Sequence, residues 1–162
     1  MEMVMIREEN RRTCFLLAAT VILGIQFALA AGFTFSIGSP AASQDFRTKT
    51  AAFVFRTEGC ADPAKPQISG TAEGLVDGVR RSVPLKLMET ARPGVYAVNQ
   101  NWPDEGAWVV ALRGTCADAR AGAIVPIGQR GFIRESSKFL PRAATKAEIE
   151  TSLKALTQGV NK

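Results

Sequence analysis

The sequence predicts an all-β fold: an antiparallel β-sandwich of about seven short strands, with an N-terminal signal or anchor helix and a short C-terminal amphipathic helix. Three observations lead to this prediction. Short runs rich in β-branched and aromatic residues alternate with turn-forming residues about every ten positions. Hydrophobic residues recur at helical spacing near the C-terminus. The apolar run at the N-terminus is typical of an export signal.

The export signal consists of three arginines followed by an apolar run from Cys14 to Ala31. Residues 28–30, Ala-Leu-Ala, supply the small side chains of a cleavage site. Two interpretations remain open. Either a peptidase removes residues 1–30, or residues 14–35 stay in the membrane as a single anchor. Both predict an exported protein, periplasmic or extracellular, and the second adds membrane contact through residues 14–35.

The rest of the chain is predicted to form a linker, one domain and a tail. Residues 31–48 include the small, polar run from Gly38 to Gln44 and are interpreted as the linker. Residues 49–140 are the β-sandwich domain, and residues 141–162 are the C-terminal helix and tail.

Turn signals and alternation place the strands within this domain. Pro84 lacks a backbone N–H, so the strand that contains it is expected at a sheet edge or at a bulge. Both faces of residues 107–115 are apolar, which predicts a central strand covered on each side. The predicted strands are residues 50–56, 67–75, 79–89, 95–99, 107–115, 123–127 and 131–135.

The C-terminal helix is predicted from its first turn and its apolar stripe. Thr145 and Glu148 have the spacing of a capping box. The stripe either docks on its own domain or forms a face that binds a partner helix or surface. Its members are Ile149, Leu153, Leu156 and Val160.

Only two cysteines, Cys60 and Cys116, follow the signal segment. In an oxidising compartment an even number of cysteines indicates a disulfide, and two cysteines allow one intramolecular pairing. A free redox pair and intermolecular bridges are the alternatives, although redox sites usually bring their cysteines close in sequence.

Composition excludes several chemistries. The sequence has no histidine, which rules out serine–histidine and cysteine–histidine catalysis and imidazole-bound zinc, copper or haem. The carboxylates are scattered, as at Asp104 and Glu105, with no spacing that pairs them for acid–base work. We therefore expect a protein that is not an enzyme and has no cofactor and no metal. The net charge of +5 is dispersed along the chain, so no nucleic-acid partner is expected.

Residues 67–112 resemble small exported immunoglobulin-like or transthyretin-like sandwiches. These include carboxypeptidase-regulatory-like modules and periplasmic domains with a FixH or YtkA type of core. The resemblance implies successive antiparallel strands in a sandwich. It rests on Val83-Leu85-Leu87, on Pro93-Gly94-Val95-Tyr96 and on Gly106-Ala107-Trp108-Val109-Val110.

The sequence thus predicts a non-enzymatic exported domain with a binding or structural role in the cell envelope. An envelope protein or a polysaccharide is the expected partner. Trp102, in a turn-rich loop, is the candidate contact residue, and the alternative is that its side chain folds back over the end of the sandwich as a lid. One alternative is a membrane-anchored accessory subunit of an envelope complex. Another is a thiol–disulfide accessory protein that uses Cys60 and Cys116.

Overall fold

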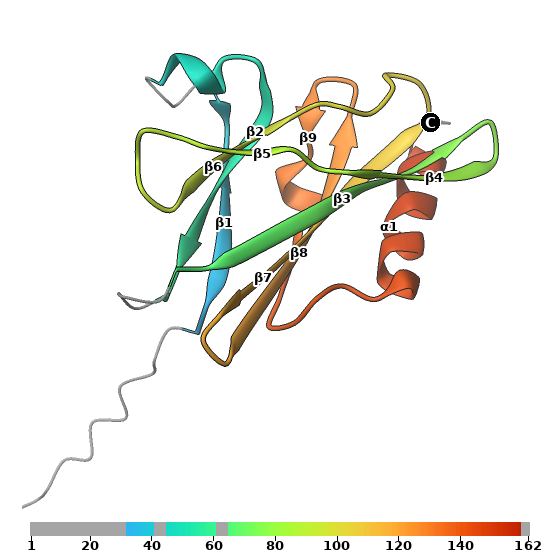
Figure 1. Cartoon of the computed structure of the whole chain (residues 1–162). Coiled ribbons are helices and arrows are strands. Elements are labelled where there is room, and N and C mark those ends of the chain that lie inside the picture. Colours follow the sequence, from blue (N-terminus) through green and yellow to red (C-terminus); the bar gives the residue numbers. More distant parts are fainter. Residues whose placement is uncertain (1–31, 41–44, 61–64, 160–162) are drawn as a thin grey trace, which may run out of the picture.

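The computed structural model describes residues 32–40, 45–60 and 65–159, so the predicted signal segment lies outside the described residues. Two antiparallel sheets pack face to face, and one helix lies on the outside of the larger sheet (Figure 1). This confirms a β-sandwich-like fold with a C-terminal helix. The described residues form ten strands, against about seven expected from the turn signals.

The smaller sheet, sheet A, has the strand order β1-β2-β6-β5. Its strands are β1 (Thr34–Gly38), β2 (Ala51–Glu58), β5 (Leu87–Glu89) and β6 (Val95–Asn99). The larger, sheet B, has the order β10-β8-β7-β3-β4, and β9 also pairs with β8. Its strands are β3 (Gln67–Val76), β4 (Val79–Pro84), β7 (Ala107–Cys116), β8 (Ala119–Gly128), β9 (Gly131–Phe132) and β10 (Lys138–Leu140).

The predicted linker, residues 31–48, is wrong where it overlaps β1. This strand pairs with β2, and its Phe35 and Ile37 are buried between the sheets, as is the preceding Phe33. The alternation of Phe33, Phe35 and Ile37 is a strand pattern, but it directly follows the apolar run of the export signal and merges with it. A short helical turn, Phe46–Thr48, then leads into β2.

The strand predicted over residues 79–89 is two strands, β4 in sheet B and β5 in sheet A. The alternating residues of this segment, Val83, Leu85 and Leu87, do pack against the core. The chain changes sheets after Pro84, the last residue of β4. Because β4 is an edge strand, the prediction from Pro84 is confirmed.

Near the end of sheet B one prediction is corrected and one strand is present that was not predicted. Residues 131–135 are not one strand: β9 has two residues and is followed by a 3-10 turn, Arg134–Ser136. The three-residue strand β10 was not predicted, because so short a run carries no periodicity.

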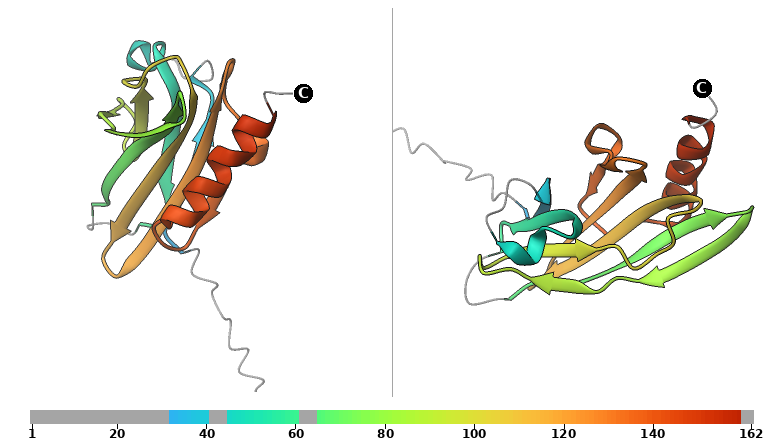
Figure 2. Two further views of the ribbon diagram at one scale, coloured as in Figure 1. Left: turned by 90° about the vertical axis from the view of Figure 1, so that its right-hand side faces the viewer. Right: turned by 90° about the horizontal axis from the view of Figure 1, so that it is seen from above.

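The central position of β7 is confirmed. One of its faces, with Val110 and Leu112, joins Phe53 and Phe55 of β2 in the main core between the sheets. The opposite face presents Val109 to the helix. Sheet B is therefore covered on both sides, as Figure 2 shows from the side.

The helix α1 (Lys146–Gly159) begins at the predicted capping box. The Glu148 N–H donates to the Thr145 hydroxyl at 3.3 Å, and the Thr145 N–H donates to the Glu148 carboxylate at 2.8 Å. Ile149 and Leu153 pack against Val109 and Ile124 on sheet B. Val160, the last residue of the predicted stripe, lies outside the described residues.

Candidate functional site

A groove runs along the outer face of sheet B, with α1 as one wall and residues 131–138 as the other. The right-hand view of Figure 2 shows these two walls rising from the sheet. The groove continues over the end of the sandwich to the loop between β6 and β7, and its volume is about 1320 Å³. The groove is larger than a second hollow in the described residues, which lies beside β1 and β2, and it is the candidate functional site.

The groove exists because a proline interrupts the hydrogen bonding along β8. This strand pairs with β10 at residues 122–124 and with β9 at residues 127–128. Between these stretches the Pro126 carbonyl accepts a hydrogen bond of 2.8 Å from the Ile133 N–H. In a strand, a residue's N–H and C=O point to the same side, so the donor that Pro126 lacks would face this gap. The chain therefore leaves the sheet here as a 3-10 turn, which forms the second wall.

Two tryptophans line the groove where it crosses the end of the sandwich. The ring centroids of Trp102 and Trp108 are 6.5 Å apart. The Trp108 indole N–H donates to the Glu105 carbonyl at 2.7 Å, and Gly74 lies against the Trp108 ring, where a Cβ atom has no space. This end of the core thus requires a glycine on β3.

Of the two interpretations of Trp102, the exposed contact residue is wrong, and the lid over the end of the sandwich is the one that the structure has. The Trp102 side chain is only 5% exposed and belongs to the main core. The Gln100 side-chain amide holds the surrounding loop by donating to the Trp102 carbonyl at 3.3 Å and to the Asp104 carboxylate at 2.6 Å. Trp102 closes the end of the sandwich because so large an apolar side chain gains more from burial than from exposure.

Hydroxyl groups from both walls face the groove. Thr151 and Ser152 come from α1, and Ser136 and Ser137 come from the opposite wall. The Ser152 side-chain oxygen is buried and has no hydrogen-bond partner among the described residues. This oxygen is covered by its neighbours, whereas the Thr151 and Ser137 hydroxyls donate to the Ala147 and Ile133 carbonyls at 2.8 and 2.9 Å.

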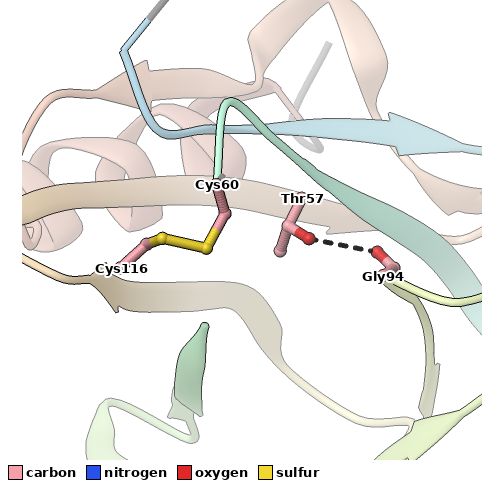
Figure 3. Close-up of a disulfide and its surroundings, with 4 residues drawn as sticks. All are labelled: Thr57, Cys60, Gly94 and Cys116. Atoms are coloured by element: carbon pink, nitrogen blue, oxygen red, sulfur yellow. Dashed lines mark hydrogen bonds between the residues drawn. A yellow bond between two sulfur atoms is a disulfide. The ribbon is translucent and has the colours of Figure 1, made fainter. Parts of the chain in front are cut away.

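The predicted disulfide between Cys60 and Cys116 is confirmed (Figure 3). Cys60 follows β2 in sheet A, Cys116 ends β7 in sheet B, and their Cα atoms are 5.8 Å apart. The bond therefore ties the two sheets together. Beside it, the Thr57 N–H donates to the Gly94 carbonyl at 3.0 Å, which joins β2 to the turn before β6.

The predicted partner-binding face of α1 is used inside the domain. Ile149 and Leu153 are 8% and 3% exposed, and both contact sheet B. They therefore offer no surface to a partner in this fold, whereas Leu156 is half-buried and lines the groove.

The shifted pKa values belong to structural contacts outside the groove. Hydrogen bonds from Arg142, and then from Thr145, lower the pKa of Glu148. Hydrogen bonds from Arg56 and Ser36 lower the pKa of Glu58.

The described residues contain neither a metal-binding cluster nor a membrane-spanning helix. No group of three acidic, cysteine or histidine side chains is placed to hold a metal ion in this part of the chain. In the same residues, no helix combines the length and apolar character needed to cross a bilayer.

No family model, curated protein or solved structure matches this chain. Its function must therefore be argued from its own residues. Sequence reasoning missed the groove, although Pro126 inside a predicted strand was a signal that the ladder breaks there.

Proposed function

We propose that this chain is a non-enzymatic, exported β-sandwich domain that binds a partner in the cell envelope through the groove beside α1. The observation that carries the proposal is the groove itself. It combines apolar side chains, such as Leu156 and Ile133, with hydroxyl-bearing residues from both walls. Apolar concave surfaces with a few converging polar groups are the usual form of binding sites.

Export is the second part of the proposal. It is supported by the basic and apolar N-terminal sequence. The disulfide agrees with an oxidising compartment, because such bonds rarely persist in the cytosol. The domain is proposed to be periplasmic or extracellular, either free after cleavage or held by the N-terminal segment.

The absence of enzyme activity is supported by chemistry. The groove is lined by the carboxylates Asp104 and Glu135 and by the amine of Lys138, but by no nucleophile paired with a base. The sequence contains no histidine that could supply one.

Filling the groove tests the binding role. Ala155→Trp introduces a large side chain on the groove wall, and Ala147→Trp introduces the same side chain on the same helix but outside the groove. We expect the full chain and the Ala147→Trp variant to cross-link to the same components of solubilised envelope. Ala155→Trp should reduce this capture at least about tenfold, because loss of one well-packed contact costs about 1.4 kcal/mol or more. Equal capture by both variants contradicts a binding role for the groove.

A further inference from the structure

Basic residues that are far apart in the sequence meet on the outer face of sheet B, at the disulfide end of the sandwich. Arg113 of β7 pairs with Gly122 of β8, and Thr115 pairs with Arg120. Arg113 and Arg120 alternate with the buried residues of their strands, so both side chains point outward on this face. The Arg142 backbone lies over Gly122, which leaves no room for a Cβ atom there. We call Arg113, Arg120 and Arg142 the arginine patch.

The charges around the patch leave it basic. The Arg113 guanidinium donates to the Ser69 hydroxyl at 2.7 Å, which is a neutral partner. Arg142 forms an ion pair with Glu148 at 2.8 Å, so its charge is largely compensated. One carboxylate, Asp118, is exposed in the β7–β8 turn. Two further cations are exposed at this end: Lys65 just before β3 and Lys146 at the start of α1. Among the residues that the structure describes, this end of the sandwich therefore carries excess positive charge that α1 does not cover.

The N-terminal segment joins the domain at the same end. Phe33 packs beside Gly114 of β7, on the core face of sheet B, close in sequence to the outward-facing Arg113 and to the disulfide at Cys116. In Figure 1 the lower end of β1 lies next to the β7–β8 turn and to the loop that leads into α1, and Figure 2 agrees. Phe33 is buried, and Gly32 alone separates it from the apolar run that ends at Ala31.

We propose that the disulfide end of the domain docks on an anionic bilayer, with Arg113 and Arg120 against lipid phosphate groups. This deepens the proposed function, because it rests on export of the domain and assigns the orientation in which the groove is presented. Basic side chains near a bilayer interact with anionic headgroups over about a Debye length, roughly 8 Å at physiological salt. The short connection to Phe33 keeps the patch within that distance while the N-terminal segment is in the membrane. On this orientation the groove end, with Trp102, points away from the bilayer.

The test uses the chain as recovered from cells, with its N-terminus identified by mass spectrometry. It is bound to nanodiscs of phosphatidylcholine with or without phosphatidylglycerol, doped with a gadolinium-chelating lipid. We expect amide signals of residues 116–120 and 142–146 to broaden in the anionic discs, and those of residues 77–78 and 104–106 to stay sharp. Arg113→Gln with Arg120→Gln should weaken binding of a chain that begins at Ala31 about 30-fold, since each basic residue contributes about a factor of five. In a chain that keeps residues 1–30, the short connection to Phe33 would itself hold this end near the bilayer, so the effect of the arginines is read from the chain that begins at Ala31.

The matched control removes the same charge at the opposite end of the sandwich. Arg81→Gln with Arg130→Gln should change binding less than about twofold, because these side chains lie beyond the screening length from the docked end. Equal broadening at both ends, or the same pattern without anionic lipid, overturns the proposal. So does arginine-dependent binding to heparin without binding to the anionic discs, which would assign the patch to a polysaccharide. Selective broadening without groove-dependent capture supports bilayer docking and contradicts the proposed binding role of the groove. Groove-dependent capture without selective broadening supports the binding role and contradicts bilayer docking.

Discussion

The two ends of the sandwich hold the sheets together by different means. At one end, the disulfide between Cys60 and Cys116 joins β2 to β7. At the other end, Trp102 and Trp108 pack together beneath the loop between β6 and β7. The disulfide fixes Cys60 relative to Cys116 and places little constraint on the neighbouring chain. The packing of the two tryptophans instead requires the loop between β6 and β7 to close over the end of the core.

This difference explains where surfaces for partners arise. The disulfide end admits the N-terminal strand beside Cys116 and carries the arginine patch. The tryptophan end holds its loop in place through Gln100, and the ordered loop extends the groove over the end of the sandwich. The domain thus presents a charged surface at one end and a mixed apolar and polar groove at the other.

The largest expected effect comes from removing the covalent tie. Cys60→Ser with Cys116→Ser should lower the free energy of unfolding by about 4 kcal/mol, because the bond closes a loop of more than fifty residues. Urea denaturation measures the loss, and the variant should not respond to reductant. A loss below about 1 kcal/mol would mean that packing alone holds this end. Ready reduction of the bond in the folded protein by mild reductant would favour the thiol–disulfide function.

The packing of Trp102 at the other end should contribute nearly as much to stability as the disulfide does. Trp102→Ala should lower the free energy of unfolding by about 3 kcal/mol, because it leaves a cavity against Trp108. Combined with loss of the disulfide, the two effects should add within about 0.5 kcal/mol, since the sites lie at opposite ends. A large coupling energy would show that the ends are not independent. Phe46→Ala is the control, because this aromatic side chain is 74% exposed and should cost little.

The smallest effect concerns the start of α1 and depends on pH. Arg142 and Thr145 lower the pKa of Glu148 in the folded state below its ordinary value of 4.5. A lowered folded-state pKa stabilises the protein above the unfolded value, and this stabilisation is lost as the pH falls below about 4.5. The urea midpoint should therefore fall less between about pH 5 and pH 3 in Glu148→Gln than in the unchanged protein. Glu150→Gln, an exposed change on the same helix, should keep the original pH dependence.

Local signals predicted much of the fold. The capping box, the edge position of Pro84 and the central position of β7 each depend on a few neighbouring residues, and the structure has all three. The disulfide followed from a count of two cysteines. These features need no knowledge of distant contacts.

The features that were missed depend on tertiary contacts. β1 was hidden because its alternation adjoins an apolar run with a different role. The sequence left Trp102 open between a surface contact and a lid, because the loop around it is polar and the ring it packs against comes from β7. The groove and the arginine patch each combine segments from separate strands and from α1, so neither could be located from the linear sequence, although Pro126 marks the point where the hydrogen bonding along β8 is interrupted.

The burial of Phe33 and Phe35 also bears on the order in which the domain assembles. β1 is an edge strand, bonded to β2 on one side, and it is the strand nearest to the export signal. Under the proposed export, a chain held at the membrane by its N-terminal segment would leave β1 with the least freedom to move into place. The other strands would then collapse first, and β1 would complete the sandwich last. Such late docking of β1 would leave Phe53 and Phe55 less well covered until export is finished.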